Sequence, residues 1–565
     1  MESCEICGQS RSLADGTIGV PCSGPCGRTV HAHCAAVTGV RLANADCGIF
    51  WFCDACRRGL HSLVPGPNTA SNTAADLPEL PGEVWTEVFR YMSADQLLRM
   101  RLVCRRWRDI VTGSPALMAK LTVSFRGRKF KPDYLLPVSK ASLRSFEGID
   151  GGWWESFGQG LVEIEIKSRQ YEDSPRIKLA GVLKMLKHTP NLRRLELGGC
   201  YLIDKHSVSA DYCLEKVEKL VLDNIQNHAG RLKIFRKICP NVKSLVITWF
   251  EEDAVVDPVE VAKFVKGYRS GLEELEVNCL DQCLTELLKL DRLNLKKLTL
   301  TYDTPEEKEF KDDRKLMKLL RMHPSLEYLD VQGMLTFNNR NGMMLNELGQ
   351  LLPNLKFLSI YASHVDPSFL HQIVKLQTFK MRGREKSLTS IRSSTFTSES
   401  HPNLRELHLT NVHLNDEHVL ATLPNLRILS LKKCKLDNWR AFLTALSALP
   451  LLQNLKLDIY KVACKPTPHT LHPKALTNLR YLKFTSHNTT TKDTARHMLV
   501  TLVTMVPNLW ELHLKYIELG PEILGAIFLN LTQLKRFVTS GCDTESVLSC
   551  HIRQQCCALE ELNLK

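Results

Sequence analysis

The chain has 565 residues, of which 44% are hydrophobic and 24% charged, and a formal net charge of +13 at pH 7. A chain of this length is too long to fold around one compact core, which predicts several domains or an elongated array. The sequence does not begin with the basic and apolar segments of a secretory signal, and no run of eighteen apolar residues occurs. We therefore expect a cytoplasmic or nuclear protein that does not associate with a membrane. Spread over this length, the positive charge favours acidic partners in general but gives no expectation of direct nucleic-acid binding.

Eight cysteines lie in the first sixty residues; six of them form three pairs with two or three residues between the partners, and Cys34 forms a fourth such pair with His31. This spacing lets one tight turn present two ligands to a zinc ion. In the reducing compartment expected here, zinc is favoured over disulfides. Four pairs predict two structural zinc ions, which can supply on the order of 10 kcal/mol to the folding of so small a segment. The predicted ligands are Cys4, Cys7, Cys22, Cys26, His31, Cys34, Cys53 and Cys56.

With histidine fifth in the ligand order and Trp51 two residues before Cys53, residues 1–60 resemble a plant homeodomain (PHD) finger. No aromatic residue lies between Cys4 and Cys47, so the aromatic cage of a methyl-lysine reader is not expected. A purely structural role is favoured, and an unmodified histone tail is the alternative ligand. The resemblance implies that one zinc is bound by Cys4, Cys7, His31 and Cys34, and the other by Cys22, Cys26, Cys53 and Cys56.

Residues 61–76 are rich in Pro, Gly, Ser, Asn and Thr and predict a flexible linker. Residues 77–118 then carry three short amphipathic segments. Pro81 can open the first helix, Ser93 can cap the second, and Val103 and Trp107 share a face of the third with other apolar residues. So small a unit cannot bury much surface alone, so part of its apolar surface is expected to meet a partner.

This second stretch resembles the F-box through Leu80-Pro81, Val88-Phe89 and the run RLVCRRW that ends at Trp107. F-boxes dock on the Skp-type adaptor of cullin-RING ubiquitin ligases, so the resemblance implies this adaptor and its cullin as partners. The residues implied in adaptor contact are Leu80, Pro81, Val84, Val88, Phe89, Leu97, Leu98, Leu102, Val103, Cys104 and Trp107.

From residue 161 to 565 the motif P-N-L-x-x-L-x-L recurs, with clear copies at Pro190, Pro402, Pro424 and Pro507. About sixteen copies lie roughly 21 to 31 residues apart, which is the leucine-rich-repeat range. Both leucines of L-x-L point to one side of a strand, so each repeat needs its neighbours to bury them. The predicted fold class is multidomain: a zinc-stabilised finger, a short all-α F-box and an α/β leucine-rich-repeat solenoid (horseshoe), with residues 119–160 connecting the last two and starting the solenoid.

The middle residues of the L-x-L strands face away from this core, and they change from acidic or neutral to basic along the chain. Exposed charges usually serve solubility, but one sign on several consecutive strands creates a summed field. We therefore hypothesise that strands from about residue 379 to 515 bind an acidic or phosphorylated protein segment. The residues assigned to this surface are Lys380, Arg382, His408, Lys432, Lys456, Lys483, His513 and Lys515.

No glycine-rich phosphate loop, zinc-protease motif or nucleophile motif occurs, which predicts a chain without catalytic activity. The sequence predicts the substrate-recognition subunit of an SCF-type cullin-RING ubiquitin ligase. One alternative is a chromatin-associated scaffold without ligase activity, because the domain order resembles the C-terminal part of F-box jumonji histone demethylases. The other is a RING-like ligase, against which the position of the histidine argues.

We expect the full-length protein to contain two zinc ions and the Cys53→Ala/Cys56→Ala variant to contain one, because that variant removes half of one ligand set. Inductively coupled plasma mass spectrometry of gel-filtered protein measures the zinc content. Cys47→Ala, outside the pattern, is the control and should retain both ions. A zinc-free wild type, or an unchanged zinc content in the double variant, would contradict the assignment.

Overall fold

The structure is a computed structural model of the whole chain. It describes residues 19–21, 29–31, 80–125, 138–144, 152–167, 176–199, 201–203, 209–223, 232–248, 257–278, 281–290, 293–301, 313–332, 347–361, 367–383, 389–391, 396, 401–462, 474–486, 492–542, 559 and 561–564. Internal contacts divide the chain into two units, residues 1–85 and 86–565. Each unit is described by itself below.

In the first unit, β1 (Gly19–Pro21) pairs antiparallel with β2 (Thr29–His31), and Gly19 lies opposite His31. In the sequence, these two strands flank the predicted ligands Cys22 and Cys26. His31 is described only as backbone of β2, and the other seven predicted zinc ligands lie outside the described residues, as does the linker 61–76. The zinc sites therefore stay a prediction.

The F-box segment forms α2 (Gly82–Arg90), α3 (Ala94–Val103), α4 (Arg105–Gly113) and α5 (Pro115–Met118), and the division between the units falls within α2. Ser93 caps α3 as predicted, in a reciprocal capping box with Gln96. The prediction that Val103 belongs to the third helix is wrong, because Val103 ends α3. Cys104 is extended between the two helices, and its sulfur accepts the Trp107 amide at 3.4 Å.

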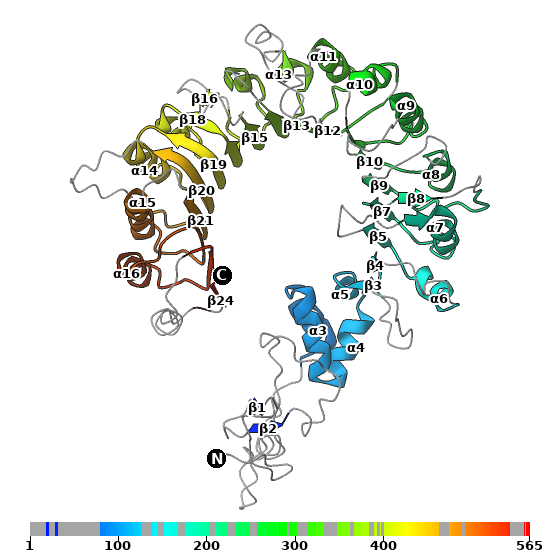
Figure 1. Cartoon of the computed structure of the whole chain (residues 1–565), viewed down its shortest axis with the longest axis horizontal. Coiled ribbons are helices and arrows are strands. Elements are labelled where there is room, and N and C mark those ends of the chain that lie inside the picture. The colour runs from blue at the N-terminus through cyan, green and yellow to red at the C-terminus, as the bar shows by residue number, and fades with distance from the viewer. Residues whose placement is uncertain are drawn as a thin grey trace, which may run out of the picture. The chain divides into compact units, whose positions relative to one another are not determined.

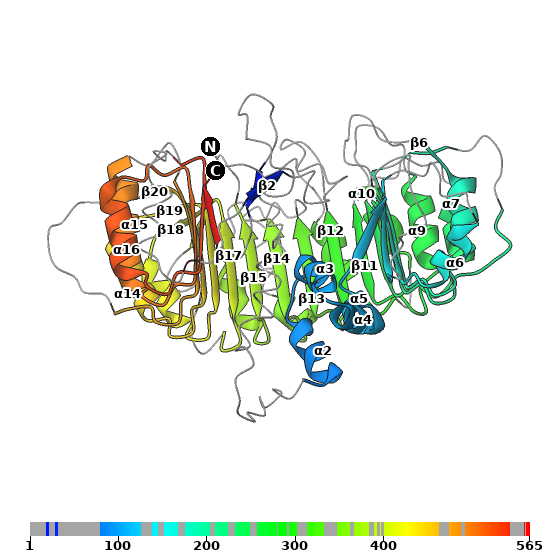
Figure 2. The same ribbon diagram turned by 90° about the horizontal axis from the view of Figure 1, so that it is seen from below.

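The second unit continues into one sheet of parallel strands, which lie side by side in chain order (Figure 2). Its strands are β3 (Thr122–Phe125), β4 (Lys140–Leu143), β5 (Glu163–Lys167), β7 (Arg194–Gly198), β9 (Lys219–Asp223), β10 (Ser244–Thr248), β11 (Glu274–Asn278), β12 (Lys297–Thr301), β13 (Tyr328–Gln332), β14 (Phe357–Tyr361), β15 (Thr378–Arg382), β17 (Glu406–Thr410), β19 (Ile428–Leu436), β20 (Asn454–Val462), β21 (Tyr481–Ser486), β22 (Glu511–Lys515), β23 (Arg536–Ser540) and β24 (Glu561–Leu564). Short parallel pairings also join β6 (Arg176–Lys178) to β8 (Tyr201–Ile203) and β16 (Thr389–Ile391) to β18 (Val412–Leu414).

Among the described residues, helices cover one face of this sheet, and the other face has no helical layer (Figure 1). Each buries an apolar stripe: α9, for example, buries Val261, Phe264 and Val265 and exposes Lys263 and Lys266. No described helix is long and apolar enough to cross a membrane. The covering helices are α6 (Trp153–Gln159), α7 (Leu179–Leu186), α8 (Leu232–Ile238), α9 (Pro258–Lys266), α10 (Asp281–Leu287), α11 (Asp313–Arg321), α13 (Leu348–Leu351), α14 (Trp439–Ser447), α15 (Lys492–Met505) and α16 (Pro521–Asn530), with 3-10 turns η5 (Pro367–Gln372) and η7 (Glu417–Thr422).

The leucines of the repeat motif occupy equivalent positions on neighbouring strands. Leu407 pairs with Leu429, which pairs with Leu455, and Leu455 pairs with Leu482. All four are fully buried in one cluster that runs through the repeats. Burying a leucine contributes about 1.5–3 kcal/mol, and here the burial comes from adjacent repeats. The predicted solenoid of leucine-rich repeats is confirmed by this register.

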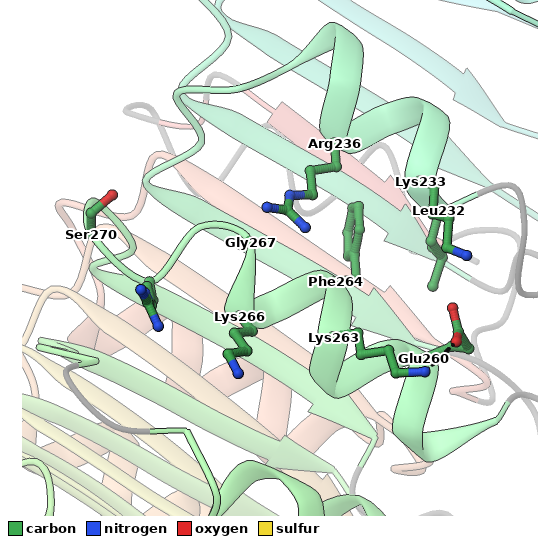
Figure 3. A pocket seen from close by; sticks show the side chains of 10 residues that line it. Leu232, Lys233, Arg236, Glu260, Lys263, Phe264, Lys266, Gly267 and Ser270 are labelled. Carbon is green, nitrogen blue, oxygen red and sulfur yellow. Dashed lines mark hydrogen bonds and ion pairs between the residues drawn. The ribbon is translucent and has the colours of Figure 1, made fainter.

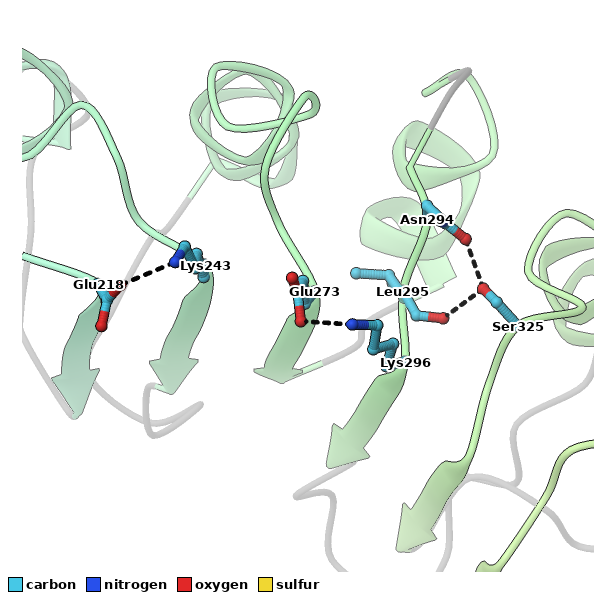
Figure 4. A network of polar contacts seen from close by, with 7 residues as sticks. All are labelled: Glu218, Lys243, Glu273, Asn294, Leu295, Lys296 and Ser325. Atoms are coloured by element: carbon cyan, nitrogen blue, oxygen red, sulfur yellow. Dashed lines mark hydrogen bonds and ion pairs between the residues drawn. The ribbon is translucent and has the colours of Figure 1, made fainter.

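The asparagine of the P-N-L motif ties each repeat to the one before it. Asn191 donates a hydrogen bond to the carbonyl of Gln159 at 2.8 Å, and Asn425 donates to that of Pro402 at 2.7 Å. Asn241, Asn403, Asn478 and Asn508 make the corresponding bond. Where serine replaces asparagine, Ser325 donates to the Leu295 carbonyl at 2.9 Å (Figure 4). The motif therefore satisfies backbone carbonyls at the repeat boundary.

The strand β3 lies within the connecting region 119–160, so the sheet begins before residue 161. Trp153 and Trp154, which begin α6, pack against Phe125 at ring-centroid distances of 6.0 and 6.3 Å. Trp154 is buried, and its indole nitrogen donates to the Met185 carbonyl at 3.0 Å. These aromatic side chains therefore close the first end of the solenoid core.

Candidate functional site

Apart from the zinc ligands and Leu80, Pro81 and Val84, the predicted site residues belong to the second unit, in the F-box helices and on the sheet face without helices. In the F-box helices, Phe89, Leu97 and Val111 are fully buried. Phe89 meets Trp107 edge to face, with ring centroids 5.5 Å apart. These rings form the small core. Phe89 and Leu97 therefore lie inside the helical unit and support its surface, but they are not themselves part of the exposed surface.

The remaining predicted adaptor residues differ in exposure. Leu102 is 86% exposed and Val103 59%, whereas Val88 and Leu98 are each 40% exposed. Cys104 is exposed and serves as the cap of α4. Leu102 and Val103 lie in the last turn of α3 and can contact a partner without displacing the core. In the first unit, Leu80, Pro81 and Val84 are exposed as well.

The sheet register places all eight predicted substrate residues on strands β15 to β22. Lys380 lies beside His408, and Lys456 lies beside Lys483, which pairs with His513. Arg382, Lys432 and Lys515 lie two residues further along their strands, on the same face. Like charges directly opposite each other destabilise a sheet, so the Lys456–Lys483 pair is a local cost that a bound anion would relieve.

Two of these lysines place their ammonium groups over aromatic rings. The ammonium of Lys380 lies 5.0 Å from the ring centroid of Phe357, and that of Lys456 lies 5.7 Å from Tyr481. Such cation–π contacts favour a charged ammonium without neutralising it. Within the described residues, Lys380, Lys456 and Lys483 form no ion pair. These three cations remain available to an acidic ligand.

Carboxylates that the sequence analysis missed lie on the same face. Glu406 approaches His408 at 3.5 Å, and Glu511 contacts both His513 at 2.5 Å and Arg536 at 3.0 Å. Asp458 is the register partner of Lys432. These carboxylates, at the first outward position of β17 and β22 and the third of β20, therefore reduce the positive field that the predicted basic residues alone would create. Reading all three outward positions of each strand would have found these carboxylates.

The earlier strands carry the opposite charge on the same face. Glu196 contacts Arg194 at 2.7 Å and also pairs with Lys167. Burial alone would raise the pKa of Glu196, but hydrogen bonds and charge from Lys167 and Arg194 hold that pKa below its ordinary value. On β11, burial raises the pKa of Glu276, and Asp330 adds to the increase. The acidic half is thus partly neutralised within the protein.

Burial lowers the pKa of His408 below its ordinary value of 6.5, and the charge of Lys380 lowers it further, while Glu406 opposes both. A lowered pKa disfavours the charged form of His408, so this residue adds less to the positive field than the sequence alone predicts. Because the unfolded chain binds this proton more tightly, the associated stability is present above pH 6.5 and is lost as the pH falls from 6.5 towards the lower pKa of the folded state.

The family model of the F-box domain matches residues 77–116, against the predicted 77–118. No curated protein matches the chain. Among solved structures, a TLR13 chain from a complex with ssRNA13 is 16% identical with a TM-score of 0.42, covering 79% of this chain and 65% of its own. A leucine-rich-repeat protein of Leptospira interrogans is 16% identical with a TM-score of 0.32, covering 69% and 99%. These values carry no argument about activity or partners.

We expect Lys380→Met to raise the pKa of His408, because it removes a neighbouring positive charge, and Glu406→Gln to lower that pKa, because it removes the opposing carboxylate. NMR titration of histidine-labelled protein measures both shifts. Lys184→Met, on a distant helix, is the control and should leave the value unchanged. Shifts of the same sign in both site variants would contradict this description of the site.

Proposed function

We propose that the chain is the substrate-recognition subunit of an SCF-type cullin-RING ubiquitin ligase. The observation that carries the proposal is the F-box match at residues 77–116, directly followed by a solenoid with a bare sheet face. In this proposal the F-box holds the Skp-type adaptor and its cullin, and the sheet face holds a protein substrate. The chain itself breaks no bond: it raises the effective concentration of substrate lysines at the conjugating enzyme.

The F-box helices support the first half of the proposal by their unequal distribution of apolar side chains. Their own core is small, since only Phe89, Leu97 and Val111 among the apolar residues of α2 to α4 are fully buried. Leu102, by contrast, is largely exposed, although it is as apolar as Leu97. A helical partner that covers Leu102 and Val103 would bury this surface, and apolar burial of this kind drives association.

The bare sheet face supports the second half. Parallel strands present outward residues at intervals of about 4.8 Å across the sheet, so an extended acidic segment can meet one lysine after another. Among the described residues, no ion pair involves Lys380, Lys456 or Lys483. An acidic or phosphorylated substrate would supply the anionic partners for these lysines. Phosphate adds a charge of about −1.5 to −2 and three acceptor oxygens.

For residues 1–60 we propose two structural zinc ions bound as a PHD-type finger. The order and spacing of the eight ligands support this proposal, as does the short hairpin of β1 and β2 around Cys22 and Cys26. The finger would add a second binding element to the receptor. An unmodified histone tail is its candidate ligand, and the receptor would then act in the nucleus.

We expect Leu102→Asp to weaken binding of the full-length chain to a Skp-type adaptor at least tenfold, because a charge replaces an apolar contact while the helical core stays intact. Isothermal titration calorimetry measures the affinity, and circular dichroism verifies the fold. Leu529→Asp is the matched control, since Leu529 is 82% exposed in α16. If the folded wild type does not bind the adaptor, or if Leu102→Asp binds equally well, the receptor proposal fails and the chromatin scaffold takes its place.

We expect the triple reversal of Lys380, Lys456 and Lys483 to Glu to abolish capture of acidic or phosphorylated proteins from cell extract, because it inverts the field of the sheet face. Quantitative mass spectrometry of captured proteins is the measurement. Reversal of Lys184, Lys318 and Lys474, which are exposed elsewhere on the unit, changes the net charge equally and should preserve capture. Equal capture by both folded variants would refute the proposed substrate surface.

A further inference from the structure

The outer layer of helices contains a cleft that the proposed function does not use. It lies between α8 and α9 and has a volume of about 470 Å³ (Figure 3). This volume lies within the range of small-molecule sites, roughly 300–1,000 Å³. Leu232 and Phe264 are buried at its wall. The cleft is lined by Leu232, Lys233, Arg236, Glu260, Lys263, Phe264, Lys266, Gly267, Arg269 and Ser270.

Five cationic side chains line this cleft, together with one carboxylate. Lys263 pairs with that carboxylate, Glu260, at 2.9 Å. Figure 3 shows this pair as the contact drawn among the lining side chains. Within the part of the chain that the structure describes, no ion pair involves the other four cations, Lys233, Arg236, Lys266 and Arg269. Among the described residues these four cations lack an ion-pair partner, so the cleft holds a concentrated positive charge that this part of the chain does not compensate.

Elsewhere on the same repeats, lysines are neutralised by the neighbouring repeat. Lys243 pairs with Glu218 at 2.8 Å and Lys296 with Glu273 at 2.9 Å, as Figure 4 shows. Cations in the last turn of a helix are also favoured by the helix dipole, which accounts for Arg236, Lys263 and Lys266. The dipole does not account for Lys233, near the start of α8, nor for Arg269, beyond the end of α9. The presence of all five around one cleft is thus a separate feature.

Gly267 leaves room for the side chain of Arg236. A Cβ atom at Gly267 would lie 2.2 Å from Nε and 2.7 Å from Cζ of Arg236. The guanidinium can therefore lie across the end of α9 only because residue 267 has no side chain. This space admits a planar donor fork at the wall of the cleft, and such a fork binds phosphate oxygens in pairs.

We propose that this cleft binds a small molecule that carries several linked phosphate groups. One phosphate monoester carries a charge of about −1.5 to −2, which would leave about half of the four uncompensated cations unmatched. Linked phosphates supply more charge within the same volume. The buried Leu232 and Phe264 limit water on one side and strengthen each charge contact. This site lies on the helical layer and does not depend on the proposed substrate surface.

Isothermal titration of inorganic tripolyphosphate into the full-length protein tests the proposal. The wild type should bind one equivalent, and orthophosphate should bind at least tenfold more weakly. Arg236→Glu with Arg269→Glu should raise the Kd for tripolyphosphate at least tenfold. Lys184→Glu with Lys318→Glu makes the same charge change on α7 and α11 and should alter the Kd less than twofold.

Gly267→Ala provides a test without a change of charge. The three atoms nearest to the added methyl group all belong to the flexible end of Arg236. The chain should therefore fold while the guanidinium moves away. We expect the Kd to rise several-fold. The proposal is overturned if wild-type protein does not bind tripolyphosphate, if both double reversals weaken binding equally, or if orthophosphate binds as tightly.

Discussion

The structure depends on one constraint: the two leucines of each L-x-L strand cannot be buried within their own repeat. Leu429 lies between Leu407 and Leu455 on the adjacent strands, and all three are fully buried. Each repeat is therefore stable only against its neighbours, as in other one-dimensional arrays. The asparagine bonds across repeat boundaries, such as Asn425 to Pro402, add directional contacts to this apolar stack. Together they hold the strands in a register that repeats from β3 to β24.

This register determines where function can lie. Since the leucines and the helices occupy one side of the sheet, the middle residues of the strands form continuous rows on the other side. Lys380, Lys456 and Lys483 belong to such a row, although more than a hundred residues separate the first and last of them. The F-box adds a second surface at the start of the same unit, where Leu102 is exposed beyond a small aromatic core. A receptor needs both surfaces on one folded support.

The repeat pattern predicted most of this fold because it is local: L-x-L specifies which side chains face the core, and P-N-L marks each boundary. Three features were less accessible. Val103 was assigned to the wrong helix, since the cap formed by Cys104 interrupts an otherwise continuous apolar pattern. Glu406 and Glu511 lie at the first outward position of their strands, whereas the basic surface is predicted from the middle and third outward positions. The basic cleft between α8 and α9 is lined by residues of two repeats, so no local sequence motif predicts it.

The most direct test of the receptor account is whether one chain links capture to modification. Proteins captured by the wild type should gain ubiquitin when adaptor, cullin, RING subunit, conjugating enzyme and ATP are added, as measured by mass spectrometry of ubiquitin remnants. The Leu102→Asp variant should capture the same proteins and leave them unmodified, because only its adaptor surface is altered. Equal modification by the wild type and by Leu102→Asp, or no modification by either, would contradict the account.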